Sequence, residues 1–124
     1  MDGEQIGSRF VGALAAKDDA ALRGLFDPEV AFRGLTPREA WEASTPDQVL
    51  EVLFGNWIEP GDHVQEVLGY ESEQISDRTR LRYRLRVETE GTTYLVDQQG
   101  YFDSANGQIT RMSLMCSGFR PWPE

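Results

Sequence analysis

The sequence predicts an α+β fold, in which N-terminal helices pack on a curved, mainly antiparallel sheet with one apolar face. Apolar residues recur at helical spacing near the N-terminus, and Thr45 begins a strong helix-start motif. From His63 onward apolar and polar residues alternate, which is typical of strands. Helices followed by consecutive strands favour α+β over α/β architectures. A chain of 124 residues fits one domain, which we expect to span residues 1–124.

Two short helices, or one bent helix, are predicted at the N-terminus. Asp18 is placed to cap the second run, and the apolar residues at helical spacing are Ile6, Phe10, Ala13, Leu14, Leu22, Leu25 and Phe26. Asp27-Pro28 ends the run, because proline lacks the backbone donor and restricts the residue before it. A short strand over residues 30–33 is expected next, stopping at Gly34.

Two further helix starts are predicted where a hydroxyl residue precedes proline and an acid or amide follows. These motifs are Thr36-Pro37-Arg38-Glu39 and Thr45-Pro46-Asp47-Gln48. The second opens a helix whose broad apolar face consists of Val49, Leu50, Val52, Leu53, Phe54 and Trp57. Such a face packs on a large surface. The segment Glu59-Pro60-Gly61-Asp62 closes this helix.

Three or four strands fill the rest of the chain. The first spans Val64 to Ile75 with a bend near Gly69, and the second spans Thr79 to Thr89, where apolar residues alternate with arginines. A two-residue turn at Glu90-Gly91 places Val87 opposite Tyr94, Leu85 opposite Val96, Tyr83 opposite Gln98 and Leu81 opposite Gly100. The same register sets Arg84 against Asp97 and Arg78 against Asp103, so hydrophobic pattern and charge agree. An odd-length loop around Asn106-Gly107 then keeps Met112, Leu114 and Cys116 on the apolar face.

Composition narrows the classes of partner. The net charge of -9 opposes binding to nucleic acid or to anionic membranes and suits a small neutral or cationic ligand. No long apolar run and no basic segment before an apolar one occur, so we expect neither a membrane span nor a signal peptide, and a cytoplasmic location. Cys116 and His63 are each the one residue of their type, which argues against a disulfide, a metal site or a metal cofactor.

Two segments of this sequence resemble the nuclear transport factor 2-like superfamily, which includes ketosteroid isomerases and SnoaL-like polyketide cyclases. They are the opening FVGALAAKDDAALRGLFDPEVAF and the closing QQGYFDSANGQITRMSLMC, in the expected order and spacing. The resemblance implies a cone-shaped, cystatin-like sheet wrapped around helices, with a deep pocket between them. It also implies a homodimer across the outer sheet face. The family hosts isomerases, dehydratases, cyclases, epoxide hydrolases and non-catalytic modules.

The chemical groups of the ketosteroid isomerase pattern do not carry over to this chain. Phe10 stands where that pattern has a tyrosine, Gly34 where it has the general base, and Gly100 where it has the acid on the strand. The Asp-Arg-Asp group of the limonene epoxide hydrolase relatives finds no match either. Steroid isomerisation and that type of epoxide hydrolysis are therefore disfavoured.

Three polar residues are expected side by side on the concave face, namely Tyr83, Gln98 and Cys116. They could form a polar row that hydrogen-bonds a ligand at the floor of the pocket. Alternatively, Tyr83 and Gln98 satisfy each other in the core and Cys116 packs as a small apolar residue. Both interpretations remain open from the sequence.

The remaining candidate site residues each have a functional and a structural interpretation. His63 is the one side chain suited to acid-base catalysis near neutral pH, unless it lies on the surface. Arg120 faces the pocket by parity and could bind an anion, unless the strand ends at Gly118. Apolar residues expected to bind substrate, or simply to form core, are Phe10, Phe54, Trp57, Leu85, Met112, Leu114 and Cys116, with Trp41 beside them.

Two functions follow from these observations. The first is a SnoaL-like cyclase or isomerase of a polyketide-type pathway, in which Tyr83, Gln98 and His63 polarise an apolar substrate through neutral hydrogen bonds, without a cofactor. The second is a non-catalytic ligand-binding or dimerisation module of the same fold.

Overall fold

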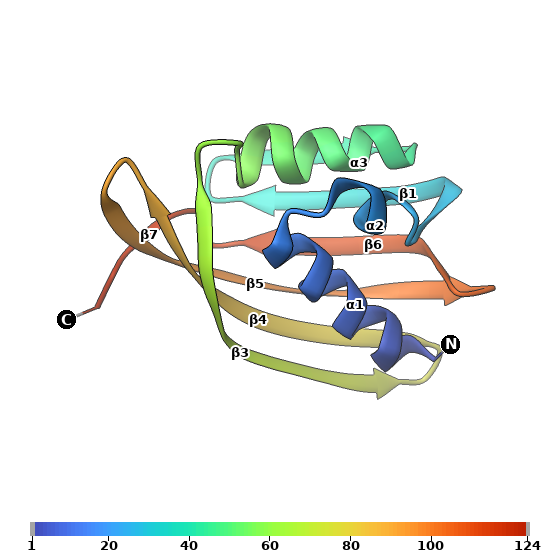
Figure 1. Ribbon diagram of the computed structural model, residues 1–124. Coiled ribbons are helices and arrows are strands. Elements are labelled where there is room, and N and C mark those ends of the chain that lie inside the picture. The colour runs from blue at the N-terminus through green and yellow to red at the C-terminus, as the bar shows by residue number, and fades with distance from the viewer. Residues whose placement is uncertain (1, 124) are drawn as a thin grey trace.

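The computed structural model describes residues 2–123, and within them the chain forms a curved mixed sheet with helices on one face (Figure 1). The sheet has seven strands in the order β2-β1-β6-β5-β4-β3, with β7 paired to the end of β5. Neighbouring strands are antiparallel except β1 and β6, which are parallel. The α+β prediction is therefore confirmed. No helix among the described residues is long and apolar enough to cross a membrane.

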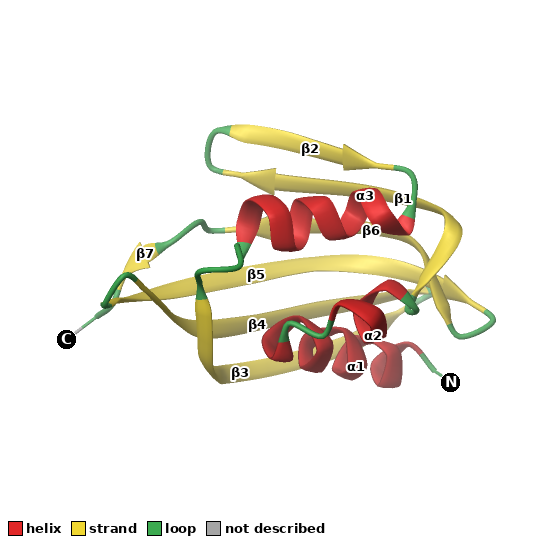
Figure 2. Cartoon of the chain, turned by 45° about the horizontal axis from the view of Figure 1, so that its top comes forward, coloured by secondary structure: helices red, strands yellow, loops and turns green. Residues whose placement is uncertain are grey.

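The N-terminal helices are α1 (Gly3–Ala16) and α2 (Asp19–Arg23), as the spacing predicted. Asp2 and Gln5 form a reciprocal capping box at the start of α1, and Asp18 caps α2 by accepting from the Ala21 amide at 3.1 Å. Helix α1 lies against β3 and β4 on what we call the inner face of the sheet, as both views show (Figures 1 and 2). The opposite face is the outer face.

The motif at Thr36 does not start a helix, so that prediction is wrong. Strand β1 (Phe26–Thr36) turns at Pro37-Arg38 into β2 (Glu39–Ala43), with Thr36 paired to Glu39. Proline is as favourable in the first central position of a β-turn as in the first turn of a helix. Pairing with β2 and β6 then decides the outcome, and the Thr36 hydroxyl accepts from Trp41 Nε1 at 3.1 Å.

Strand β1 is also longer than the four residues that the sequence predicted. It starts at Phe26 and includes Pro28, which lies where the register with β6 shifts between Phe26 and Ala31. A proline is tolerated at such an irregularity, because no ladder hydrogen bond is required from it.

The motif at Thr45 does start a helix. Helix α3 (Pro46–Val52) begins after Thr45, whose hydroxyl accepts from the Gln48 amide at 3.1 Å, and it continues into a π-helical turn, η1 (Leu53–Trp57). Residues Val49, Leu50, Leu53 and Trp57 are buried against β1 and the rest of the core. The π-helical turn ends at Trp57, and the segment from 58 to 62 leads into β3.

The remaining strands are β3 (His63–Ile75), β4 (Arg78–Thr89), β5 (Thr92–Ala105), β6 (Gln108–Cys116) and β7 (Arg120–Pro121). The predicted register of β4 with β5 is confirmed, with Tyr83 opposite Gln98 and Leu81 opposite Gly100. The bend near Gly69 is confirmed as irregular pairing on either side of Val67. Inward-facing Leu81, Tyr83, Leu85 and Val87 are each at most 1% exposed, so they form the core beneath α1.

The charges on the outer face pair in part as expected. Arg78 and Asp103 form an ion pair of 3.1 Å, which the register predicted. Asp97 lies opposite Arg84 in the register but pairs with Arg82 at 2.8 Å. Diagonal neighbours lie within reach of long side chains, so a correct register does not determine which arginine an aspartate binds.

The hairpin of β5 and β6 keeps the predicted faces by a different device. Asn106 and Gly107 form a two-residue turn with φ of 54° and 78°, in place of the expected odd-length loop. Both central residues of a type I′ turn need positive φ, which Asn-Gly supplies. The odd residue is Thr110 of β6, a β-bulge opposite Asp103 and Ser104, and it brings Met112, Leu114 and Cys116 to the inner face.

Candidate functional site

A cavity of about 500 Å³, here called the end cavity, lies where η1, the β4–β5 turn and the segment before β7 meet. These segments gather at the end of the molecule opposite the N-terminus in both views (Figures 1 and 2). Three aromatic residues line it, namely Trp41, Trp57 and Phe119, and so do three acidic residues, Glu59, Asp62 and Glu90. Val96 and Cys116 contribute from β5 and β6. The end cavity is thus aromatic and acidic.

The predicted polar row is present below this cavity. The Tyr83 hydroxyl donates to Gln98 Oε1, and Gln98 Nε2 donates to Cys116 Sγ at 3.3 Å. Tyr83 and Gln98 are both 1% exposed, and Cys116 is the member of the row that also lines the end cavity. The row therefore extends from the core to the cavity. Within it, the Tyr83 hydroxyl and Gln98 Oε1 are bonded to each other.

Burial keeps both ionisable members of the row neutral. Desolvation raises the pKa of Tyr83 well above its ordinary value, with a smaller contribution from Cys116. Burial also raises the pKa of the Cys116 thiol, although hydrogen bonds with the Gly118 backbone and the Gln98 side chain oppose this. The row therefore offers neutral hydrogen bonds, and its thiol is a poor nucleophile at neutral pH because the thiolate is the reactive form.

We expect these raised pKa values to make the protein less stable in alkali. The ordinary pKa values are 9.0 for Cys116 and 10.0 for Tyr83, and the unfolded chain releases both protons there, whereas the folded chain keeps them to higher pH. The free energy of unfolding is then unaffected by these groups below pH 9.0 and falls above it, since the folded state binds more protons. Urea unfolding at a series of pH values measures the slope. Tyr83→Phe should flatten it, and an unchanged slope would contradict the assignment.

A buried carboxylate in the loop after η1 was missed by the sequence analysis, which treated Asp62 only as part of a helix end. Asp62 is 7% exposed, and its Oδ2 accepts from the Glu59 amide at 2.8 Å. Lys17 Nζ donates to the backbone oxygens of Glu59 at 2.6 Å and Asp62 at 2.7 Å, and so holds the loop against the end of α1. No sequence pattern marks this position, because its burial depends on contacts between distant segments.

Trp57 lies on the wall of the end cavity, as expected for a substrate-binding residue. Its ring packs on Gly34, where a Cβ atom would lie 2.6 Å from Trp57 Cζ2, so the ring requires glycine at that position. The indole Nε1 is buried and has no hydrogen-bond partner among residues 2–123. Such unpaired buried donors are uncommon in folded proteins.

Most other apolar candidates lie in the core away from the end cavity. Phe10 packs edge-on against Phe26 and Tyr83 with ring centroids 6.2 and 6.3 Å apart. The side chains of Leu85, Met112 and Leu114 are at most 2% exposed, and Phe54 is half-buried against the same core. Of the apolar residues expected at the pocket, Trp41, Trp57 and Cys116 line the end cavity.

The other two polar candidates, His63 and Arg120, do not line the end cavity. His63 is exposed at the first position of β3, paired with Glu88. Arg120 is exposed in β7, paired with Leu95. Gly118, with φ of 73°, interrupts the strand between β6 and β7, so the parity that would turn Arg120 inward does not apply.

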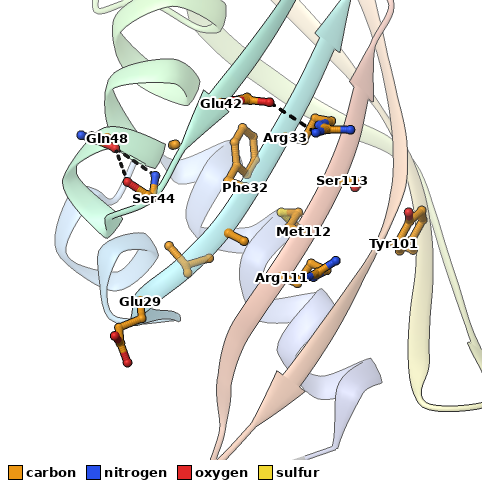
Figure 3. Close-up of a pocket in the computed structure, with 13 residues that line it drawn as sticks. Glu29, Phe32, Arg33, Glu42, Ser44, Gln48, Tyr101, Arg111, Met112 and Ser113 are labelled. Atoms are coloured by element: carbon orange, nitrogen blue, oxygen red, sulfur yellow. Dashed lines mark hydrogen bonds and ion pairs between the residues drawn. The ribbon is translucent and has the colours of Figure 1, made fainter.

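The outer face carries a separate groove of about 620 Å³ along β2, β1 and β6. Figure 3 shows Arg33 paired with Glu42 at 3.3 Å across it, with Arg111 and Tyr101 further along and α1 behind the sheet. Beside it lies a smaller, more apolar groove that includes Leu35, Tyr101 and Met115, each between 40% and 49% exposed. This is the face on which the sequence resemblance implies a dimer. Among residues 2–123 no group of three His, Cys, Asp or Glu could hold a metal ion.

Comparisons with known proteins support the fold. No protein-family model and no curated protein sequence matches the chain. A proposed polyketide cyclase from Pseudomonas putida KT2440 superimposes with a TM-score of 0.74 at 13% identity, covering 92% of this chain and 90% of that one. A proposed isomerase from Bacillus subtilis gives 0.73 at 12% identity, covering 94% and 90%. An NTF2-like protein of unknown function from Cytophaga hutchinsonii gives 0.64 at 14% identity, covering 94% and 91%. The resemblance inferred from the sequence is confirmed for the fold.

Proposed function

Since the chain has the fold of nuclear transport factor 2-like proteins, we propose that it binds a small, mainly apolar molecule in the end cavity. The observation that supports this most directly is the cavity itself, of about 500 Å³ and lined by Trp41, Trp57 and Phe119. Ligand sites of small-molecule proteins are typically concave, lined by apolar and aromatic side chains, and of this size. The proposed site differs from the pocket floor predicted from the sequence, because Tyr83 and Gln98 do not line it.

Cyclisation or isomerisation of the bound molecule is a second candidate function. Two observations favour it: solved proteins of this fold include a proposed polyketide cyclase and a proposed isomerase, and a carboxylate, Asp62, lines the cavity. A carboxylate can move a proton, and the cavity walls can hold a folded substrate in a reactive shape. Asp62 would then be the base, in place of Tyr83, Gln98 and His63, which the sequence suggested.

A cytoplasmic location remains a prediction.

The binding proposal is tested with a neutral apolar fluorophore, Nile red, titrated into the wild type and two tryptophan variants. Trp41→Ala removes a cavity wall and should weaken binding about tenfold, whereas Trp122→Ala, which removes a ring over Arg86 outside the cavity, should leave affinity unchanged. Equal affinity of all three proteins would mean that the dye does not use the end cavity.

The catalytic candidate needs a separate experiment. Polyketide-type and terpenoid molecules that raise the melting temperature are incubated with the protein, and products are separated by chromatography and identified by mass. Conversion that disappears in Asp62→Asn, with binding retained, would support cyclisation or isomerisation. Binding with no conversion of any stabilising molecule would leave the non-catalytic module.

We also propose that two copies associate through the outer face. Leu35, Tyr101 and Met115 expose apolar side chains on the neighbouring strands β1, β5 and β6. A group of exposed apolar residues on one face is typical of an interface, whereas scattered single ones are common on monomers. Light scattering should give twice the mass of the 14.0 kDa chain, and Met115→Glu should shift it to a monomer. A wild-type monomer at working concentration would reject the dimer.

A further inference from the structure

The aromatic residues of the end cavity come from three different parts of the chain. Trp41 lies on β2, Trp57 at the end of η1, and Phe119 just before β7. The Trp41 indole N–H is already bonded to the Thr36 hydroxyl, so this side chain has no donor left to offer and contributes its ring. Rings that converge from separate elements on one space can present their electron-rich faces to a cation.

The polar lining of the same cavity is one-sided in charge. Glu59, Asp62 and Glu90 line it, and none of the described residues that line it is Lys, Arg or His. Lys17 does not line the cavity, and its Nζ donates to the backbone oxygens of Glu59 and Asp62. The cavity therefore disfavours anions, and the whole-chain charge of -9 adds to this preference.

Asp62 is the buried carboxylate of the end cavity, whereas Glu59 and Glu90 are exposed. Asp62 is 7% exposed, and its Oδ2 accepts a hydrogen bond from the Glu59 amide at 2.8 Å. Oδ1 is not bonded to another residue of 2–123 and is not enclosed, so it stays accessible to a ligand. A carboxylate oxygen that is open to solvent beside aromatic rings can serve as the counter-charge of a cation.

We propose that the ligand of the end cavity is an organic cation, an amine or quaternary ammonium compound whose charged nitrogen is held between Asp62 and the rings of Trp41, Trp57 and Phe119. This rests on the proposed function, because it assigns a chemical class to the ligand of the same cavity. Asp62 supplies the counter-charge, and the ring faces replace the water that the ammonium group loses. The apolar body of the ligand then lies on Val96 and Ile58.

The test compares two molecules of the same shape that differ in charge. Choline and 3,3-dimethylbutan-1-ol are titrated into the protein, with intrinsic tryptophan fluorescence and calorimetry as readouts. We expect choline to bind at least about tenfold more tightly than its neutral isostere, in the range measured for desolvated cation–π and ion-pair contacts. Equal affinity of the two would overturn the proposal.

Two variants assign the preference to the site. Asp62→Asn keeps an oxygen that can accept from the Glu59 amide but removes the charge, so it should reduce the choline preference to less than about threefold while the neutral alcohol binds as before. Asp77→Asn makes the same chemical change in the exposed β3–β4 turn, away from the cavity, and should leave the preference intact. A preference that survives in Asp62→Asn would contradict the assigned role of Asp62.

The choline experiment can fail while the Nile red experiment succeeds, so the cation proposal and the binding proposal are tested separately. If Nile red binds in a Trp41-dependent manner but choline shows no advantage, the cation proposal fails and the binding proposal stands. If neither the dye nor the two small probes bind, both fail. Circular dichroism and melting curves of Asp62→Asn establish that the loop remains folded, so a lost preference is not a lost fold.

Discussion

Replacing Gly100 by alanine is expected to lower the free energy of unfolding by about 3 kcal/mol, at the upper end of what an overpacked core costs. A Cβ atom at this position would lie 2.0 Å from the Ser113 carbonyl oxygen and 2.9 Å from Leu114 Cα. Both are backbone atoms of β6, and β6 is held between β1 and β5, so neither can rotate away. Urea unfolding, with the midpoint and slope fitted separately, measures the loss.

Gly12→Ala is the matched control for this substitution. A Cβ atom at Gly12 would meet nothing within 4 Å, and the residue is exposed inside α1. Alanine should therefore raise stability by about 0.5–1 kcal/mol, because it restricts the unfolded chain and favours the helix. A Gly100→Ala protein as stable as the wild type would show that β5 and β6 are further apart than described.

The close approach of β6 to Gly100 also bears on whether this chain could catalyse steroid isomerisation. The sequence resemblance sets Gly100 where isomerase relatives have an acid on the strand. An aspartate there would require β6 to move before its carboxylate could enter the core, since the first side-chain atom already overlaps Ser113. Steroid isomerisation of that type is therefore not one substitution away from this chain.

Breaking the bond between Tyr83 and Gln98 is the second large effect that we expect. Tyr83→Phe leaves Gln98 Oε1 buried without its donor, and Gln98→Leu leaves the Tyr83 hydroxyl buried without its acceptor. Each should cost about 1–3 kcal/mol, the desolvation penalty of an unpaired polar group. The double variant should cost less than the sum of the two by about 1 kcal/mol or more, because it removes both partners together.

Tyr94→Phe provides the control for this cycle. Tyr94 lies on β5 as well, but it is half-buried and packs against Phe119 with ring centroids 5.3 Å apart. Its loss of a hydroxyl should change stability by less than about 0.5 kcal/mol. Strict additivity of Tyr83→Phe and Gln98→Leu would contradict the hydrogen bond, and unchanged Nile red affinity in folded Tyr83→Phe would assign the row to the core and not to the site.

Sequence reasoning failed at particular places for identifiable reasons. Thr36-Pro37-Arg38-Glu39 fits a helix start and a β-turn equally well, and the choice was made by the pairing of β1 with β2 and β6. Parity placed Arg120 inward, but Gly118 interrupts the strand, so Arg120 lies outside. Asp62 carried no signal, because its loop is held in place by long-range contacts such as that of Lys17, 45 residues earlier in the chain.

Local patterns were sufficient for the helices α1, α2 and α3, for the strands β3 to β6 and for one register. Alternation defined β4 and β5, and turn chemistry at Glu90-Gly91 set their register, so Tyr83 and Gln98 could be placed side by side from the sequence. The inward face of Cys116 was also predicted, but a β-bulge sets it in place of the expected odd-length loop. Tertiary structure decided where the cavity lies, which of the candidates line it, and that Asp62 and Phe119 join them. Trp41, Trp57, Asp62 and Phe119 belong to four separate segments, and their meeting depends on the curvature of the sheet and on long-range packing, which no short-range periodicity encodes.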